Sequence, residues 1–223
     1  MSLAHPLLAA RGVRHGFGTR ADAPPAGLLR PRQVHGAGVV MAEACRGATE
    51  ADAVVAVARG GAGHPRPIGV VTADCVPVLA AAGDGVVVAA IHAGWRGLAA
   101  GVVAAGIDAL RREAGGAALC AAIGPHVGAC CYEVDAPVLD ALRYSDADLD
   151  AAIRASRPGH WWLDLGTLTR SALRRAGLVD DAIGAFAGAC TSCDAERFHS
   201  YRRDGRRAGR LVHWIRSRSL DSP

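Results

Sequence analysis

Lysine is absent from this chain, so all 25 of its basic residues are arginine. We attribute this to a bias in composition and not to function. Aromatic residues make up only 4%, too few for the stacking platforms that bind single-stranded nucleic acid. Long apolar runs are also missing. Those near residues 68–82 and 85–93 are broken by Asp or Pro and fall short of the ~20 residues that a membrane-spanning helix needs. These absences argue against nucleic-acid and membrane partners.

The residues that are present favour one globular domain covering residues 1–223. Hydrophobic residues make up 51% of the 223 and charged residues 21%, with a mean hydropathy of +0.18. A chain of this size and composition can bury one substantial core. The net charge is only +4. The clustered arginines are interleaved with glycine and aspartate as in a turn: Arg202, Arg203, Arg206, Arg207 and Arg210.

Seven cysteines occur without a recognisable export signal, and an odd number argues against a disulfide framework. We therefore expect a cytoplasmic protein. Cys190 and Cys193 have the C-x-x-C spacing of redox and zinc motifs, but the sequence shows no second pair of that spacing, so we expect no redox role for them. Cys130 and Cys131 are adjacent and too cramped for an easy mutual disulfide.

Short apolar runs bounded by Gly, Pro or Asp predict strands at 39–41, 53–57, 68–71, 86–91, 118–123, 182–187 and 210–215. Apolar residues at helical spacing predict a long helix over 97–114, and Asp164 is a plausible N-cap for a second helix that ends at Gly177. Shorter helices are expected at 136–144 and 146–155. Strands and helices do not alternate strictly, which favours an α+β fold with mixed sheets over a doubly wound one.

A hairpin turn at 83–85 would place Val71 and Val88 on neighbouring strands. The far ends of that hairpin hold Cys75 and His92, so pairing would bring a thiol and an imidazole together. His35, in a turn before a strand, could join them.

Two histidines and one cysteine form a known catalytic zinc set, because three protein ligands leave the fourth position open for water. Copper also tolerates these donors. Zinc lowers the pKa of bound water to near neutrality. Asp74 and Arg96 lie beside the expected ligands in the sequence. We expect the carboxylate to orient a histidine or move a proton, and the guanidinium to hold an anion.

Several short motifs in the sequence resemble those of the YfiH (DUF152) family, whose members are also described as multicopper polyphenol oxidase or laccase-domain proteins. In chain order they are 33–36 (QVHG), 72–77 (TADCVP), 92–97 (HAGWRG), 124–128 (GPHVG), 131–134 (CYEV), 190–191 (CT) and 198–205 (FHSYRRDG). The resemblance runs from about residue 15 to 215, and the words around Cys75 and His92 are the most specific.

The resemblance implies an α+β domain of mixed sheets packed between helices, similar to the catalytic part of cytotoxic necrotizing factor. It also implies zinc bound by His35, Cys75 and His92. Family members are described as purine nucleoside phosphorylases acting on adenosine, inosine, guanosine or methylthioadenosine, and as adenosine deaminases. Asp74, Cys75 and Arg96 would then be catalytic. Arg96, with Arg202 or Arg203, would bind the substrate or phosphate.

One departure from the family words is His126, which stands where a smaller residue is usual; we expect a substrate contact or a fourth metal donor. The expected partners are a purine nucleoside and phosphate, in a monomer or small homo-oligomer. Three alternatives stay open: a copper oxidoreductase acting on phenols, a metal-free amidase of cell-wall precursors with Cys75 as nucleophile and His92 as base, and a non-catalytic protein that retains the fold.

Overall fold

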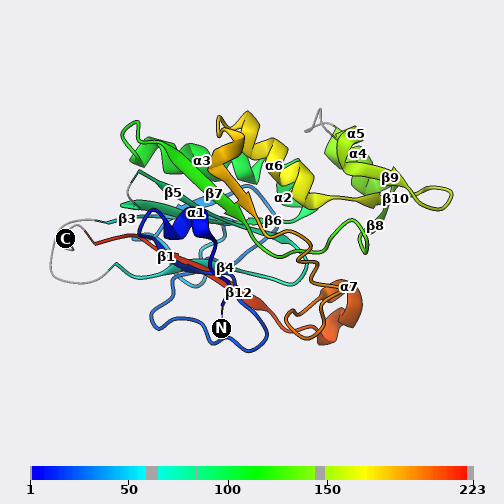
Figure 1. The fold of residues 1–223 in the computed structure, drawn as a ribbon, viewed down its shortest axis with the longest axis horizontal. Coiled ribbons are helices and arrows are strands. Elements are labelled where there is room, and N and C mark those ends of the chain that lie inside the picture. Colours follow the sequence, from blue (N-terminus) through cyan, green and yellow to red (C-terminus); the bar gives the residue numbers. More distant parts are fainter. Residues whose placement is uncertain (1, 59–64, 84, 144–148, 220–223) are drawn as a thin grey trace.

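Three β-sheets and seven α-helices make up the part of the chain that the computed structural model describes, residues 2–58, 65–83, 85–143 and 149–219 (Figure 1). The fold is α+β with mixed sheets, as predicted from the order of elements.

The largest sheet has six strands and forms the centre of the molecule. In spatial order they are β11 (Ile183–Ala185), β7 (Leu119–Ile123), β5 (Val76–Ala82), β6 (Val87–Ala93), β3 (Ala53–Val57) and β2 (Val39–Met41). The inner pairs are antiparallel, whereas β11 with β7 and β2 with β3 are parallel. The sheet is therefore mixed, with parallel pairing confined to its two edges.

Two smaller sheets of three antiparallel strands each complete the β structure. One comprises β1 (Arg14–Gly16), β12 (Leu211–Arg216) and β4 (Ile68–Thr72). The other comprises β8 (Glu133–Asp135), β10 (His160–Leu163) and β9 (Ile153–Ala155).

The helices are short apart from two. They are α1 (Pro6–Ala9), α2 (Trp95–Ala99), α3 (Val102–Glu113), α4 (Ala136–Arg143), α5 (Leu149–Ala152), α6 (Leu165–Arg175) and α7 (Tyr201–Asp204), with 3₁₀ turns η1 (Asp180–Ala182) and η2 (Gly205–Arg207). Within the described residues, none of these helices has the length and apolar character needed to cross a bilayer.

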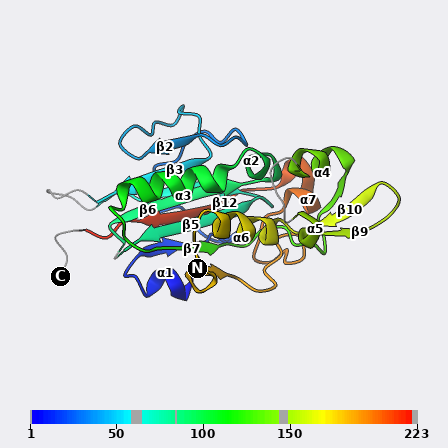
Figure 2. The same ribbon diagram turned by 90° about the horizontal axis from the view of Figure 1, so that it is seen from above.

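The central sheet is buried on both faces. Helices α3 and α6 lie along one face (Figure 2), and the sheet β1-β12-β4 lies against the other (Figure 1). Alternation along β5 supplies both interfaces: Val78 belongs to the core on the helix side, and Leu79 to the core between the sheets. Strands buried on both faces explain why these segments are continuously apolar in the sequence.

The predicted hairpin is present, with a different strand as its first arm. β5 pairs with β6 so that Ala81 lies opposite Val88, whereas Val71 belongs to β4 in the smaller sheet. The prediction that Val71 and Val88 lie on neighbouring strands is therefore wrong, because the chain changes sheet at 73–75. Asp84, in the predicted turn, lies outside the described residues.

The helix predictions hold in position but not in length. The segment 97–114 forms parts of two helices, because Gly101 adopts a left-handed backbone (φ 82°) between α2 and α3. Asp164 caps α6 as expected, accepting the Thr167 N–H at 2.9 Å. The helix expected over 146–155 is confined to α5 and gives way to strand β9; the ends of the predicted helices at 144–148 lie outside the described residues.

Candidate active site

The side chains of His35, Cys75 and His92 converge at one end of the β5–β6 hairpin. Cys75 immediately precedes β5 and His92 lies near the end of β6, in a register that places Pro77 opposite His92. One ligand atom from each of the three residues lies within 4.8 Å of the others. The sequence-based prediction of a three-donor cluster is thus met by the geometry. His92 is buried, Cys75 is half-buried and His35 is exposed, so the cluster is open on one side.

Asp52 holds this cluster in place through hydrogen bonds. Its carboxylate is fully buried and accepts the His92 Nδ1–H at 2.8 Å, which leaves Nε2 as the ring nitrogen that can bind a metal ion once it has lost its proton. It also accepts backbone N–H groups of Val34, His35 and Gly36 at 3.2, 2.9 and 2.7 Å. One carboxylate therefore orients one histidine and shapes the loop that carries the other.

Electrostatics favour a thiolate at Cys75. Burial alone would raise the pKa of its thiol, but hydrogen bonds and charge from His35 and His92 lower it to about 7. Burial would likewise lower the pKa of His92, yet Asp52 and Cys75 raise it to about 9. The thiolate is the form of cysteine that binds metals and attacks electrophiles.

The backbone is tightly constrained around these donors. A Cβ atom at Gly94 would lie 2.8 Å from Cys75 Sγ and 3.3 Å from His35 Cδ2, so only glycine fits. His35 and Asp74 both adopt left-handed backbone conformations, with φ of 61° and 86°. Such strain in non-glycine residues concentrates at functional sites, where the surrounding contacts hold it in place.

The cluster opens into a cavity of about 1100 Å³. Its wall combines the three donors with cationic and aromatic side chains: Arg30, Arg32, Arg96, Arg202, Arg210, Trp95, Tyr132 and Tyr201. Arg96 stacks on Trp95 at 4.2 Å from the ring centroid, and Arg202 lies 5.0 Å from that of Tyr132. Trp95 also packs against the core on the helix side, so it both lines the cavity and contributes to the core. Guanidinium groups bind anions and aromatic rings pack against flat apolar groups, so this lining suits an anionic ligand with a flat apolar part.

Asp74 lines the cavity, and its hydrogen bonds are not to a histidine. Its Oδ1 accepts the Thr191 hydroxyl at 2.6 Å and its Oδ2 accepts the Arg202 N–H at 2.5 Å. The expected contact with a histidine is made by Asp52 instead, because Asp52 immediately precedes β3, which pairs with β6.

The structure does not place His126 or Arg203 in the cavity wall, although the sequence analysis named both as candidates for substrate contact. His126 is outside the described cavity wall and donates its Nδ1–H to the Gly124 carbonyl at 2.8 Å, with its ring against Gly166. The structure thus places His126 in neither the three-residue cluster nor the cavity wall, and the expected substrate contact or fourth metal donor stays a prediction.

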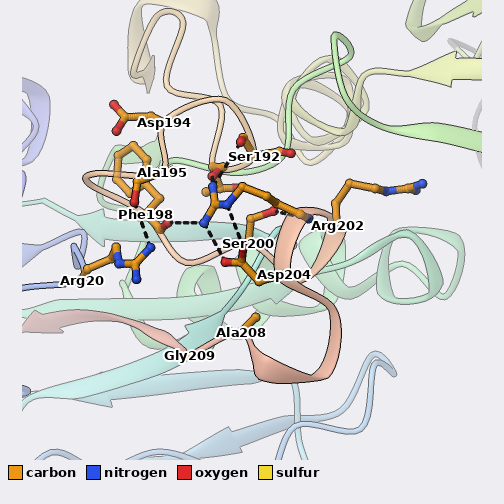
Figure 3. A network of polar contacts seen from close by, with 12 residues as sticks. Arg20, Ser192, Asp194, Ala195, Phe198, Ser200, Arg202, Asp204, Ala208 and Gly209 are labelled. Atoms are coloured by element: carbon orange, nitrogen blue, oxygen red, sulfur yellow. Dashed lines mark hydrogen bonds and ion pairs between the residues drawn. The ribbon is translucent and has the colours of Figure 1, made fainter.

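Arg203 does not line the cavity. Its guanidinium donates to the carbonyls of Thr191, Ser192 and Phe198 and to the Asp204 carboxylate, and so ties the loop together (Figure 3). Of the two neighbouring arginines, Arg202 is the one that reaches the cavity wall, and Arg203 is structural.

Sequence reasoning missed several residues of the site. Asp52 carries a weak signal, an acidic residue at the start of an apolar strand. No local pattern marks Arg30 and Arg32, whereas Arg210 belongs to the arginine cluster noted in the sequence but was not assigned to the site. No pattern in the sequence indicated that Cys130 and Cys131 lie beside Cys190 and Cys193.

Fold and site together define a class: a mixed-sheet α+β protein with a histidine–cysteine–histidine cluster at the mouth of an arginine-rich cavity. The family model described as "Multi-copper polyphenol oxidoreductase laccase" matches residues 11–218. The chain belongs to this family, which the YfiH-like words in the sequence had indicated.

Relatives and solved structures agree with this assignment. A protein of Xylella fastidiosa (strain 9a5c) named purine nucleoside phosphorylase is 40% identical over 193 residues, 82% of this chain and 70% of its own length. One of Pseudomonas aeruginosa with the same function name is 39% identical, over 82% of this chain and 71% of its own. The crystal structure of Bacillus licheniformis YfiH superposes with a TM-score of 0.81 at 25% identity, covering 93% of both chains.

Proposed function

We propose that this chain is a zinc-dependent purine nucleoside phosphorylase that also deaminates adenosine, with adenosine, inosine, guanosine and methylthioadenosine as substrates. The observation that carries the proposal is the convergence of His35, Cys75 and His92 at an arginine-rich cavity. The function names of the relatives support it.

The donor set fits zinc. A thiolate and two imidazoles are suitable ligands, and three protein donors beside an open cavity leave a fourth position free. Copper accepts the same donors, but among the described residues this is the one converging group that contains histidine, whereas a multicopper oxidase needs ligands for several ions. When bound, zinc would act as a Lewis acid and lower the pKa of a coordinated water.

The cavity wall supplies groups for both halves of the substrate. Arg96 and Arg202 offer guanidinium groups of the kind that bind phosphate through paired hydrogen bonds. Trp95, Tyr132 and Tyr201 offer aromatic faces for a purine ring. In phosphorolysis the bond between the purine nitrogen and ribose C1′ breaks and a phosphate oxygen joins C1′. Cationic side chains would stabilise the phosphate during that exchange.

Deamination needs a group that moves protons. Water replaces the exocyclic amine of adenosine, and ammonia leaves. We assign the proton transfer to Asp74, whose carboxylate lines the cavity and is held by Thr191 and Arg202. Cys75 remains a ligand in this scheme.

The decisive experiment incubates the purified chain with adenosine, with and without phosphate, and identifies the products. Adenine and ribose 1-phosphate that require phosphate, together with inosine formed without it, are expected. Alanine at His35 or His92 should abolish both activities and remove one zinc equivalent per chain. Full activity in a folded His35→Ala variant would refute the metal mechanism.

The Cys75–His92 contact also suits a nucleophilic cysteine, which keeps the amidase alternative testable. That alternative requires activity on an amide in metal-free protein, lost on alkylation of Cys75 by iodoacetamide. Oxidation of a chromogenic phenol that depends on added copper would instead favour the oxidoreductase alternative.

A further inference from the structure

Four cysteine thiols converge outside the site described above. Cys130 and Cys131 lie in the loop between β7 and β8, and Cys190 and Cys193 in the loop between β11 and α7. Their sulfur atoms all lie within 4.8 Å of one another. Sixty-odd residues separate the two pairs in the chain, so tertiary structure alone brings them together.

We propose that Cys130, Cys131, Cys190 and Cys193 form a second metal site, which binds one zinc ion through four thiolates. The proposal is independent of the nucleoside chemistry, because it uses none of the residues assigned to that reaction. Four protein ligands close the coordination sphere, so the site is structural and not catalytic.

The separations suit a tetrahedral ion. Zinc–sulfur bonds of about 2.3 Å place the four sulfur atoms of a tetrahedral site about 3.8 Å apart. Here Cys193 Sγ lies 3.5 Å from Cys130 Sγ and 3.4 Å from Cys131 Sγ. Both adjacent cysteines therefore point to the same side, towards Cys193, and small side-chain rotations suffice to surround an ion.

A disulfide explains the arrangement less well. Cys193 can form a disulfide with only one other cysteine, although the thiols of Cys130 and Cys131 approach it almost equally closely. Cys130 and Cys193 are also exposed. Exposed neighbouring thiols are prone to oxidation unless they are ligated.

The surroundings resemble those of a structural thiolate site. The Gly128 N–H donates to Cys190 Sγ at 3.2 Å, a contact that stabilises sulfur-borne negative charge. The two loops are further joined by the Thr191 N–H, which donates to the His126 carbonyl at 2.9 Å. His126 thus contributes its backbone carbonyl to this junction.

An ion here would brace the wall of the candidate active site. Thr191 follows Cys190 directly and holds Asp74 through its hydroxyl. Tyr132 follows Cys131 and lines the cavity. Linking the two loops would therefore fix the positions of one proton-transfer group and one aromatic wall.

The test is the zinc content per chain, measured by mass spectrometry on protein purified without added metal. We expect two equivalents in the unaltered chain, one in Cys193→Ser, one in Cys75→Ser and none in the double variant. Cys120→Ala is the matched control, since its buried thiol lies outside both groups, and it should retain two.

A second readout does not depend on any variant folding. Cobalt exchanged into the unaltered chain should give the strong thiolate charge-transfer absorption of a tetrahedral four-sulfur site, in excess of what one thiolate at Cys75 produces.

Unchanged zinc content in Cys193→Ser overturns the proposal. Finding iron in place of zinc also overturns it. So does an intact mass of the metal-free protein that is lower by two hydrogen atoms for each pair of cysteines, because that loss shows disulfides. If Cys75→Ser alone leaves zinc unchanged while Cys193→Ser removes one equivalent, the proposed function fails and this inference stands.

Discussion

The Nδ1–H of His92 donates a 2.8 Å hydrogen bond to Asp52, a carboxylate that the fold buries completely. The same carboxylate accepts three consecutive backbone N–H groups from the loop that carries His35. A single buried residue therefore places both histidines of the cluster. Burial alone would raise the pKa of Asp52, but these hydrogen bonds lower it, so the residue is held as a carboxylate.

Asp52→Asn should weaken zinc binding, because the amide cannot accept all these donors and no longer favours the His92 tautomer with Nε2 free. We expect a 10- to 100-fold loss of affinity, the size typical of such supporting contacts. A chelator competition titration measures it. Asp108→Asn, on the exposed side of α3, is the control and should leave affinity unchanged.

Gly94→Ala should disrupt the cluster sterically. The added methyl would lie 2.8 Å from Cys75 Sγ, closer than packed atoms tolerate. We expect the loss of one zinc equivalent in a chain that still folds. Gly38→Ala is the matched control, since its methyl would meet neighbours at an ordinary 3.5 Å. Retention of both equivalents in Gly94→Ala would contradict the observed geometry.

Arg202→Met and Arg203→Met should separate binding from stability. Removing Arg202 from the cavity wall should raise the KM for phosphate about 10- to 100-fold, the range expected for a charged hydrogen bond. Arg203→Met should instead lower the free energy of unfolding by about 2 kcal/mol, since it strips donors from three loop carbonyls. Steady-state kinetics and urea unfolding of both variants test the distinction. The reverse pattern would show that the two arginines have been assigned wrongly.

Asp74→Asn should reduce adenosine deamination about 100- to 10,000-fold, the usual contribution of a positioned acid or base. The Thr191 hydroxyl can reverse its role and accept from an amide, so the fold should persist. Phosphorolysis should decline less, because it relies on the arginines. Equal losses of both activities would argue for a purely positioning role.

Stability should fall in mild acid because of His213. This side chain is fully buried and hydrogen bonded to Thr72, and burial, with a contribution from His92, lowers its pKa from 6.5 to about 3. Below about pH 6.5, His213 therefore binds a proton in the unfolded chain but stays neutral in the folded chain. Each pH unit below that value should cost ~1.4 kcal/mol of unfolding free energy from this group.

His213→Gln retains a partner for Thr72 but takes up no proton. Urea unfolding at several pH values between about 7 and 4.5 should give a shallower decline for this variant than for the unaltered chain, by about one proton. Identical slopes would mean that other groups control the acid sensitivity.

Local pattern was most informative where an element is decided by its own residues. All seven predicted strands exist, because apolar runs bounded by Gly, Pro or Asp are strong signals for strands, whereas β1, β5, β8, β9 and β10 were not predicted. The Asp164 cap was also predicted, since a capping side chain acts within one turn. Gly101 was overlooked as a break between helices because apolar periodicity continues on either side of it.

The sequence by itself determined the class of fold, the family and the three donors at His35, Cys75 and His92, because each depends on residue types at recognisable spacings. Only the tertiary structure decided that Asp52 supports those donors, that Arg202 and not Arg203 faces the cavity, and that Cys130 and Cys131 meet Cys190 and Cys193. These relationships arise from loops that start on different strands. No periodicity along the chain encodes such a meeting; the packing of the sheets alone creates it.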